Sequence, residues 1–123
     1  MGNRTPERPI DLAAVRAAQE HMLSPRNERR MREILDALCD PTRVKIVRAL
    51  SETTLAAGDL AHVIERSRPA TSQHLKVLRE VGAVVAKREG NTVRYSLSDE
   101  VSADIIENAA ASFDRLEVTG SGD

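Results

Sequence analysis

Basic side chains gather in one stretch of this 123-residue chain, between Arg66 and Arg94. The stretch holds seven arginines and lysines against two acidic residues, a formal charge of +5. From Tyr95 to Asp123 seven acidic residues oppose the single Arg115, a charge of −6, so the net charge of −1 hides a polarised molecule. Because phosphates are drawn to positive potential, the basic stretch predicts contact with a nucleic acid.

The basic stretch divides into a helix and a hairpin. Ser67 is a favourable N-cap, Pro69 suits the first turn, and leucine and valine recur at helical spacing until Gly82. Runs 84–87 and 92–97 read as strands around Gly90-Asn91, a pair that readily takes the positive φ angles of a tight hairpin. An apolar run that opens at Gly58 or Asp59 predicts another helix just before. The pattern therefore predicts a helix-turn-helix over 58–82 and a wing over 83–97.

Polar residues on the second of these helices and in the wing are expected to contact DNA, some at base edges and some at phosphates. The chain has one tyrosine, one phenylalanine and no tryptophan, too few for the stacking platform of single-strand binders, which favours double-stranded DNA. The alternative is a winged-helix protein-interaction module without DNA affinity. The predicted DNA-binding residues are Arg68, Pro69, Ala70, Thr71, Ser72, Gln73, His74, Lys76, Arg88, Asn91 and Arg94.

The rest of the chain is predicted to be mainly helical, so the expected fold class is mainly α with a small β-hairpin (α+β). Helices are expected over 10–23, 26–39 and 99–117, with another that begins at Pro41 and a short strand at 54–55 that could pair with the hairpin. A single domain over 10–118 is expected, flanked by disordered tails over 1–9 and 119–123.

A wide apolar stripe on the last helix exceeds what a small core can shelter, which predicts a homodimer. The helix over 10–23 is expected to contribute beside it. The predicted interface residues are Leu12, Val15, Met22, Ile105, Ile106, Ala109, Phe113 and Leu116.

The single cysteine, Cys39, excludes an intramolecular disulfide framework. It falls on the apolar face of the helix over 26–39, so it is expected to point inward as a small hydrophobic residue. The alternative is a thiol-based redox-sensing repressor that uses Cys39. No Gly-rich phosphate loop, H-E-x-x-H or G-x-S-x-G motif is present, so neither an enzyme nor a cofactor is expected. No apolar run approaches a membrane span and no signal region precedes the domain, which predicts a cytoplasmic protein.

The order of these motifs and the residues that form them resemble the ArsR/SmtB family of bacterial winged-helix repressors. The resemblance rests on Ala37 to Arg43, Asp59-Leu60-Ala61, Ser67 to Gly82, and Arg88 to Asn91 followed by Tyr95-Ser96-Leu97. It implies a homodimeric repressor on a palindromic operator, with one recognition helix per subunit in a major groove and release when an effector binds. The effector itself is not specified.

The resemblance also shows where this chain departs from the family's metal sensors. A C-x-C pair of the family falls at Ala56 and Gly58, and a site on the final helix keeps Asp99 but has Val101, Ser112 and Arg115 at further ligand positions. Several converging ligands are needed for a transition metal, so no metal site is expected there. The three histidines, His21, His62 and His74, are also expected not to bind metal; His74 is assigned to packing or DNA contact.

Overall fold

The computed structural model describes residues 7–120, with the backbone alone described for Val101 and residues 117–120. The chain divides into two compact units, 1–30 and 31–123. The expected single domain over 10–118 crosses this division and stays a prediction. Of the expected N-terminal tail, residues 7–9 form no helix or strand, and residues 1–6 lie outside the described part.

The first unit contains the short helix α1 (Leu12–Gln19) and the start of α2 (Pro25–Leu38). Asp11 caps α1, since its side chain accepts a hydrogen bond from the Ala14 amide at 3.0 Å. The helix is shorter than the predicted 10–23, because the amides of His21 and Met22 bond to carbonyls only three residues back. None of its residues is buried.

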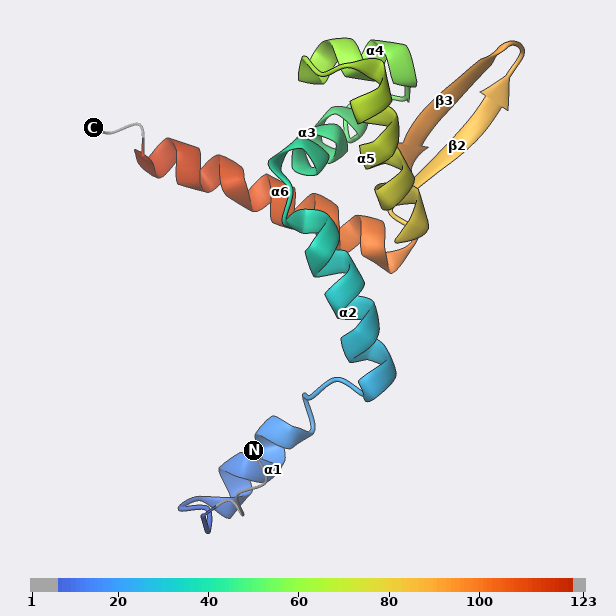
Figure 1. Ribbon diagram of the computed structural model, residues 1–123. Helices are drawn as coiled ribbons and strands as arrows, with labels where there is room; N and C mark the ends of the chain where they lie inside the picture. Colours follow the sequence, from blue (N-terminus) through green and yellow to red (C-terminus); the bar gives the residue numbers. More distant parts are fainter. Residues whose placement is uncertain (1–6, 121–123) are drawn as a thin grey trace. The chain divides into compact units, whose positions relative to one another are not determined.

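The second unit carries the remaining elements, drawn in Figure 1. After α2 come α3 (Pro41–Leu50), β1 (Leu55–Ala56), α4 (Ala57–Ile64), α5 (Arg68–Glu80), β2 (Val84–Glu89), β3 (Thr92–Leu97) and α6 (Val101–Gly120). The strands form an antiparallel sheet in the order β1-β3-β2. The predicted class, mainly α with a small β-hairpin, is confirmed, and the expected strand at 54–55 pairs with β3 one residue later than predicted.

Helix α6 is longer than predicted. It continues to Gly120, so the prediction of a disordered tail that starts at Thr119 is wrong, and residues 121–123 lie outside the described part. The side chains of Ser102, Ala103, Ile106 and Ala110 recur at three- and four-residue spacing and are all buried. This face of α6 packs on α3.

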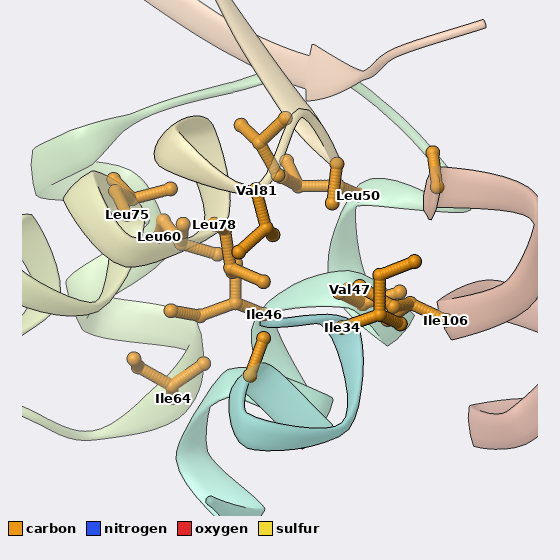
Figure 2. Close-up of a cluster of buried hydrophobic side chains, with 14 of the residues drawn as sticks. Ile34, Ile46, Val47, Leu50, Leu60, Ile64, Leu75, Leu78, Val81 and Ile106 are labelled. Atoms are coloured by element: carbon orange, nitrogen blue, oxygen red, sulfur yellow. The ribbon is translucent and has the colours of Figure 1, made fainter. Parts of the chain in front are cut away.

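The hydrophobic core lies between α2, α3, α4, α5 and α6, closed by the start of β2 (Figure 2). Ile106 belongs to this core with an exposed fraction of 1%, so its assignment to a dimer interface is wrong. The stripe on α6 wraps around the helix, and sequence alone did not show which part of it faces the subunit's own core.

Cys39 is exposed, so the expectation that it points inward is also wrong. Helix α2 ends at Leu38, and Cys39 lies in the turn that leads to Asp40. Helical periodicity no longer governs the direction of a side chain beyond the end of the helix.

Candidate nucleic-acid interface

A tight turn joins α4 to α5. Glu65 has left-handed backbone angles, φ 56° and ψ 48°, and the Arg66 amide bonds back to the Ala61 carbonyl at 3.1 Å. Ser67 then caps α5, its hydroxyl accepting from the Ala70 amide at 3.2 Å. These two closures form the predicted helix-turn-helix.

The two faces of α5 differ in burial. Leu75 and Leu78 pack in the core, whereas Arg68, Ser72, Gln73 and Lys76 are exposed. Pro69 is exposed and Ala70 is half-buried at the start of the helix. The outer face therefore presents a polar and basic row to solvent, as a recognition helix requires.

Thr71 does not belong to that row. It lies four residues before Leu75 and so shares the buried face, with an exposed fraction of 0%. Its hydroxyl donates to the Ser67 carbonyl at 2.9 Å. The prediction that Thr71 meets DNA is wrong, because the side chain holds the first turn of α5 together.

His74 faces α3 instead of the outer surface. Its Nδ1 atom lies 3.9 Å from Oδ2 of Asp40, and 23% of its side chain is exposed. Burial raises the pKa of the Asp40 carboxyl, but hydrogen bonds from the Thr42 and Arg43 amides and the charges of His74 and Arg43 outweigh this and hold the pKa below its ordinary value. Of the two roles expected for His74, the structure supports packing, because the side chain is engaged with the N-cap of α3.

The wing presents its basic residues on two faces. In the β2–β3 ladder Lys87 pairs with Arg94 and Arg88 pairs with Val93, and side chains of paired residues share a face. Arg88 therefore lies on the face of Val93 and Tyr95, and Lys87 and Arg94 lie on the other. Gly90, with φ +65°, closes the hairpin, and Asn91 follows it, exposed at the tip.

Arg94 is also engaged within the sheet. Its Nε atom lies 3.7 Å from a carboxylate oxygen of Glu89, and its Nη1 donates to the Thr54 carbonyl at 3.5 Å. Its charge is therefore partly offset by a neighbouring carboxylate, and its side chain lies on the face of the sheet opposite Tyr95. This placement distinguishes Arg94 from Arg88, although both were predicted to bind DNA.

A groove of about 390 Å³ lies between α5 and the wing, hereafter the α5–wing groove. Its lining includes Arg68 and Ser72 from α5, and Asn91, Thr92 and Tyr95 from the wing. Arg68 Nη1 lies 4.0 Å from the point where a β-carbon would stand on Gly58, so this side chain reaches back to the first turn of α4. No acidic side chain is among the described lining residues.

Sequence reasoning missed two residues at this surface. Thr92 lines the α5–wing groove, and its position next to Asn91 was the available signal. Arg79 lies with Lys76 in a second hollow of about 480 Å³ between α5 and β2. Ser72, Lys76 and Arg79 are spaced by four and three residues, which places them on one exposed face.

Metal ligands are sparse in the described part of the chain. No group of three or more histidine, cysteine, aspartate or glutamate side chains lies close enough there to hold an ion. At the positions of the family's C-x-C pair, Ala56 and Gly58 begin α4 next to Arg68. A guanidinium beside those positions disfavours a cation.

Comparison with known proteins places this chain among bacterial regulators. The model described as "Bacterial regulatory protein, arsR family" matches residues 40–85. A Staphylococcus aureus protein named cadmium resistance transcriptional regulatory protein CadC homolog is 39% identical over 88 residues, which cover 71% of this chain and 73% of that protein. A transcriptional repressor SmtB homolog of Synechocystis is 36% identical over 73% of this chain and 68% of its own length.

Solved structures agree with the sequence matches. The transcriptional repressor BigR of Xylella fastidiosa superposes with a TM-score of 0.67 and 27% identity, over 83% of this chain and 96% of that one. Among the described helices, none combines the length and the apolar composition of a membrane-spanning segment. The helix-turn-helix, the wing and the matched relatives together show that this chain is a transcriptional regulator, not an enzyme, and that it belongs to the arsR family of bacterial regulatory proteins.

Proposed function

We propose that this regulator is a homodimeric repressor that binds a palindromic duplex operator and is released by an effector. As a regulator of bacterial genes it would act in the cytoplasm, where the DNA is. The observation that carries the proposal is the α5–wing groove, because it brings Arg68 and Ser72 of the recognition helix beside Asn91 and Thr92 of the wing. The names of two relatives, "repressor" in each, support the direction of regulation.

Two kinds of DNA contact are assigned to this surface. Arg68, Ser72, Gln73 and Lys76 lie on the outer face of α5 and are assigned to the major groove. Arg88 and Asn91 of the wing are assigned to backbone phosphates beside it. Arg94 is given a smaller part, because the nearby carboxylate of Glu89 partly offsets its charge.

The dimer interface is assigned to apolar side chains left exposed on the second unit. On α6 Ile105 and Leu116 are exposed and Ala109 is half-buried, on a side of the helix that turns away from the buried face. Phe113 is also exposed, but it lies three residues after the buried Ala110 and lines a hollow with α3 residues, so it is left out of the proposed interface. On α2 Met31 and Leu35 are exposed four residues apart. Exposed apolar side chains aligned on helices are typical of subunit interfaces.

The earlier assignment of Leu12, Val15 and Met22 to the interface stays part of the proposal. Leu12 and Met22 are exposed and Val15 is half-buried in the first unit. Met31 and Leu35 were not predicted, because the sequence pattern assigned the apolar side of α2 to the subunit's own core.

The test is selection of bound duplexes from a random pool, followed by a salt titration of the selected duplex. We expect a palindromic sequence and an affinity that falls steeply with salt, because phosphate neutralisation releases counterions. A protein-interaction module would select no sequence and would show no such salt dependence. Failure to select a sequence, or an affinity that does not change with salt, would refute the assignment as a repressor.

A further inference from the structure

A cavity away from the DNA surface lies where the end of α2, the first turns of α3 and the later part of α6 meet, hereafter the α3 cavity. Its volume is about 530 Å³, within the range of about 300 to 1,000 Å³ that small-molecule sites occupy. Leu38, Pro41, Val44 and Phe113 supply its apolar walls, and the exposed thiol of Cys39 lies at its edge. All of these residues belong to the second unit.

The charged residues of the α3 cavity are both cations, Lys45 and Arg48. Arg48 is fixed by Asp114 of α6, with Nη2 of Arg48 2.5 Å from Oδ1 of Asp114. Lys45 is exposed, and no acidic side chain of the described lining balances it. An apolar hollow with one uncompensated ammonium group at its rim favours a ligand with an apolar body and one negative charge.

We propose that the α3 cavity binds a small organic anion with an apolar body, such as a medium-chain carboxylate, and that this ligand is an effector of DNA binding. Ligand binding in the α3 cavity does not depend on the proposed function. Only the ligand's role as an effector of DNA binding rests on it. Apolar carbon fills the space between Val44 and Phe113, and the carboxylate meets Lys45.

The start of α3 connects the cavity to the recognition helix. Pro41 lines the cavity, and the preceding residue, Asp40, caps α3 through hydrogen bonds from the amides of Thr42 at 2.7 Å and Arg43 at 3.3 Å. The same Asp40 carboxylate faces His74 of α5 at 3.9 Å. A ligand that displaces the first turn of α3 therefore changes a contact of the helix that reads DNA. Because such coupling is reciprocal, bound DNA must change the affinity for the ligand by the same factor.

Calorimetry on the full chain without DNA tests the binding site, with octanoate, octan-1-ol and octylamine as probes of one chain length and three charges. We expect octanoate to bind tighter than octan-1-ol by roughly threefold to tenfold, and octylamine to bind weakest. Lys45→Glu should abolish the preference for octanoate. Lys87→Glu makes the same charge change on an exposed lysine of the wing, and it should leave octanoate binding unchanged.

A second variant removes the space instead of the charge. Val44→Phe fills the cavity and should weaken octanoate and octan-1-ol alike, with a thermal unfolding curve to show that the chain is folded. Equal affinities for the three probes in the wild type would overturn the proposal, as would octanoate binding that survives both Lys45→Glu and Val44→Phe. If Val44→Phe left octanoate binding intact but dissociated the dimer, a second copy of the chain would be the occupant and the proposal would again fail.

The effector role is measured separately by fluorescence anisotropy with the selected duplex. Octanoate should lower DNA affinity in the wild type and leave Lys45→Glu unaffected. Octanoate binding with no change in DNA affinity would overturn the effector role. A chain that binds no duplex would refute the proposed function, whereas the calorimetry would still decide the site.

Discussion

Arg68 is the side chain whose placement most directly predicts sequence preference. It is exposed at the start of α5, and it lies in the α5–wing groove with its guanidinium beside α4. An arginine can form two hydrogen bonds with guanine in the major groove, and losing one such contact costs about 1 to 3 kcal/mol. We expect Arg68→Ala and Gln73→Ala to change which duplexes are selected from a random pool. Thr71→Ser, at a buried position on the same helix, is the control and should select the wild-type sequence.

Arg88 and Arg94 of the wing are expected to contribute differently to DNA binding. Arg88 shares the face of Tyr95, which lines the α5–wing groove, whereas Arg94 is on the other face and is paired with Glu89. We expect Arg88→Ala to weaken binding to all duplexes similarly and to reduce the salt slope by about one unit. Arg94→Ala should have a smaller effect on both. Equal losses in the two variants would mean that DNA contacts both faces of the wing.

The carboxylate of Asp40 makes the free energy of unfolding depend on pH. The pKa of this carboxyl is held below its ordinary value, so its contribution to stability is fully present above about pH 4 and is lost as the pH falls through the lower, folded-state pKa. Asp40→Ala should lower the free energy of unfolding at neutral pH by about 0.5 to 2 kcal/mol, the usual loss for a helix cap. Chemical denaturation at neutral and acidic pH measures both effects. The difference between wild type and variant should shrink in acid.

The turn between α4 and α5 shows how local backbone geometry supports the helix-turn-helix. Glu65 is the one residue other than glycine with positive φ in the described chain, and that conformation costs a residue with a side chain about 1 to 2 kcal/mol. Glu65→Gly removes this strain but adds freedom to the unfolded chain, so we expect a net gain of about 0.5 to 1 kcal/mol. Thermal unfolding measures it. A destabilised variant would show that the Glu65 side chain contributes more than the backbone strain costs.

At the scale of helices and strands, the elements with local signals were predictable from sequence. Ser67 caps α5 as expected, α3 begins at Pro41 as predicted, and Gly90 closes the wing. The wrong predictions concern residues whose side-chain direction cannot be inferred from the local sequence pattern. Thr71 has a polar side chain but the spacing of a core residue, and Cys39 lies one residue past the end of a helix.

The candidate site was predictable in part. The exposed face of α5 follows from helical spacing, so Arg68, Gln73 and Lys76 were placed correctly on the surface. The pairing of Arg94 with Glu89 depends on the register of the two strands, and the contact of His74 with Asp40 joins two helices. Contacts of that kind arise from tertiary packing, which composition and periodicity do not encode.

For the whole molecule, helix α6 carries two apolar faces with different roles. Ile106 is buried against the subunit's own core, whereas Leu116 has an exposed fraction of 65%. A carboxylate at Ile106 would lie unpaired in the core, a change that costs several kcal/mol. We therefore expect Ile106→Asp to unfold the subunit, and circular dichroism should show the loss of helix. A folded Ile106→Asp protein would contradict the placement of this face.

The exposed face of α6 gives the cleaner test of the dimer. Ile105→Asp and Leu116→Asp place a charge where the proposed partner packs, and burying it without a partner would cost several kcal/mol of association free energy while leaving each subunit folded. Monomers should then bind the operator poorly, because a dimer fixes two recognition helices about one turn of DNA apart, ~34 Å, and a single half-site loses that gain. Val63→Asp introduces the same charge at an exposed valine of α4, outside the proposed interface, and should remain dimeric. Sedimentation and a mobility-shift assay on the three variants decide the matter: a folded monomer that binds the operator as tightly as the wild type would remove dimerisation from the mechanism.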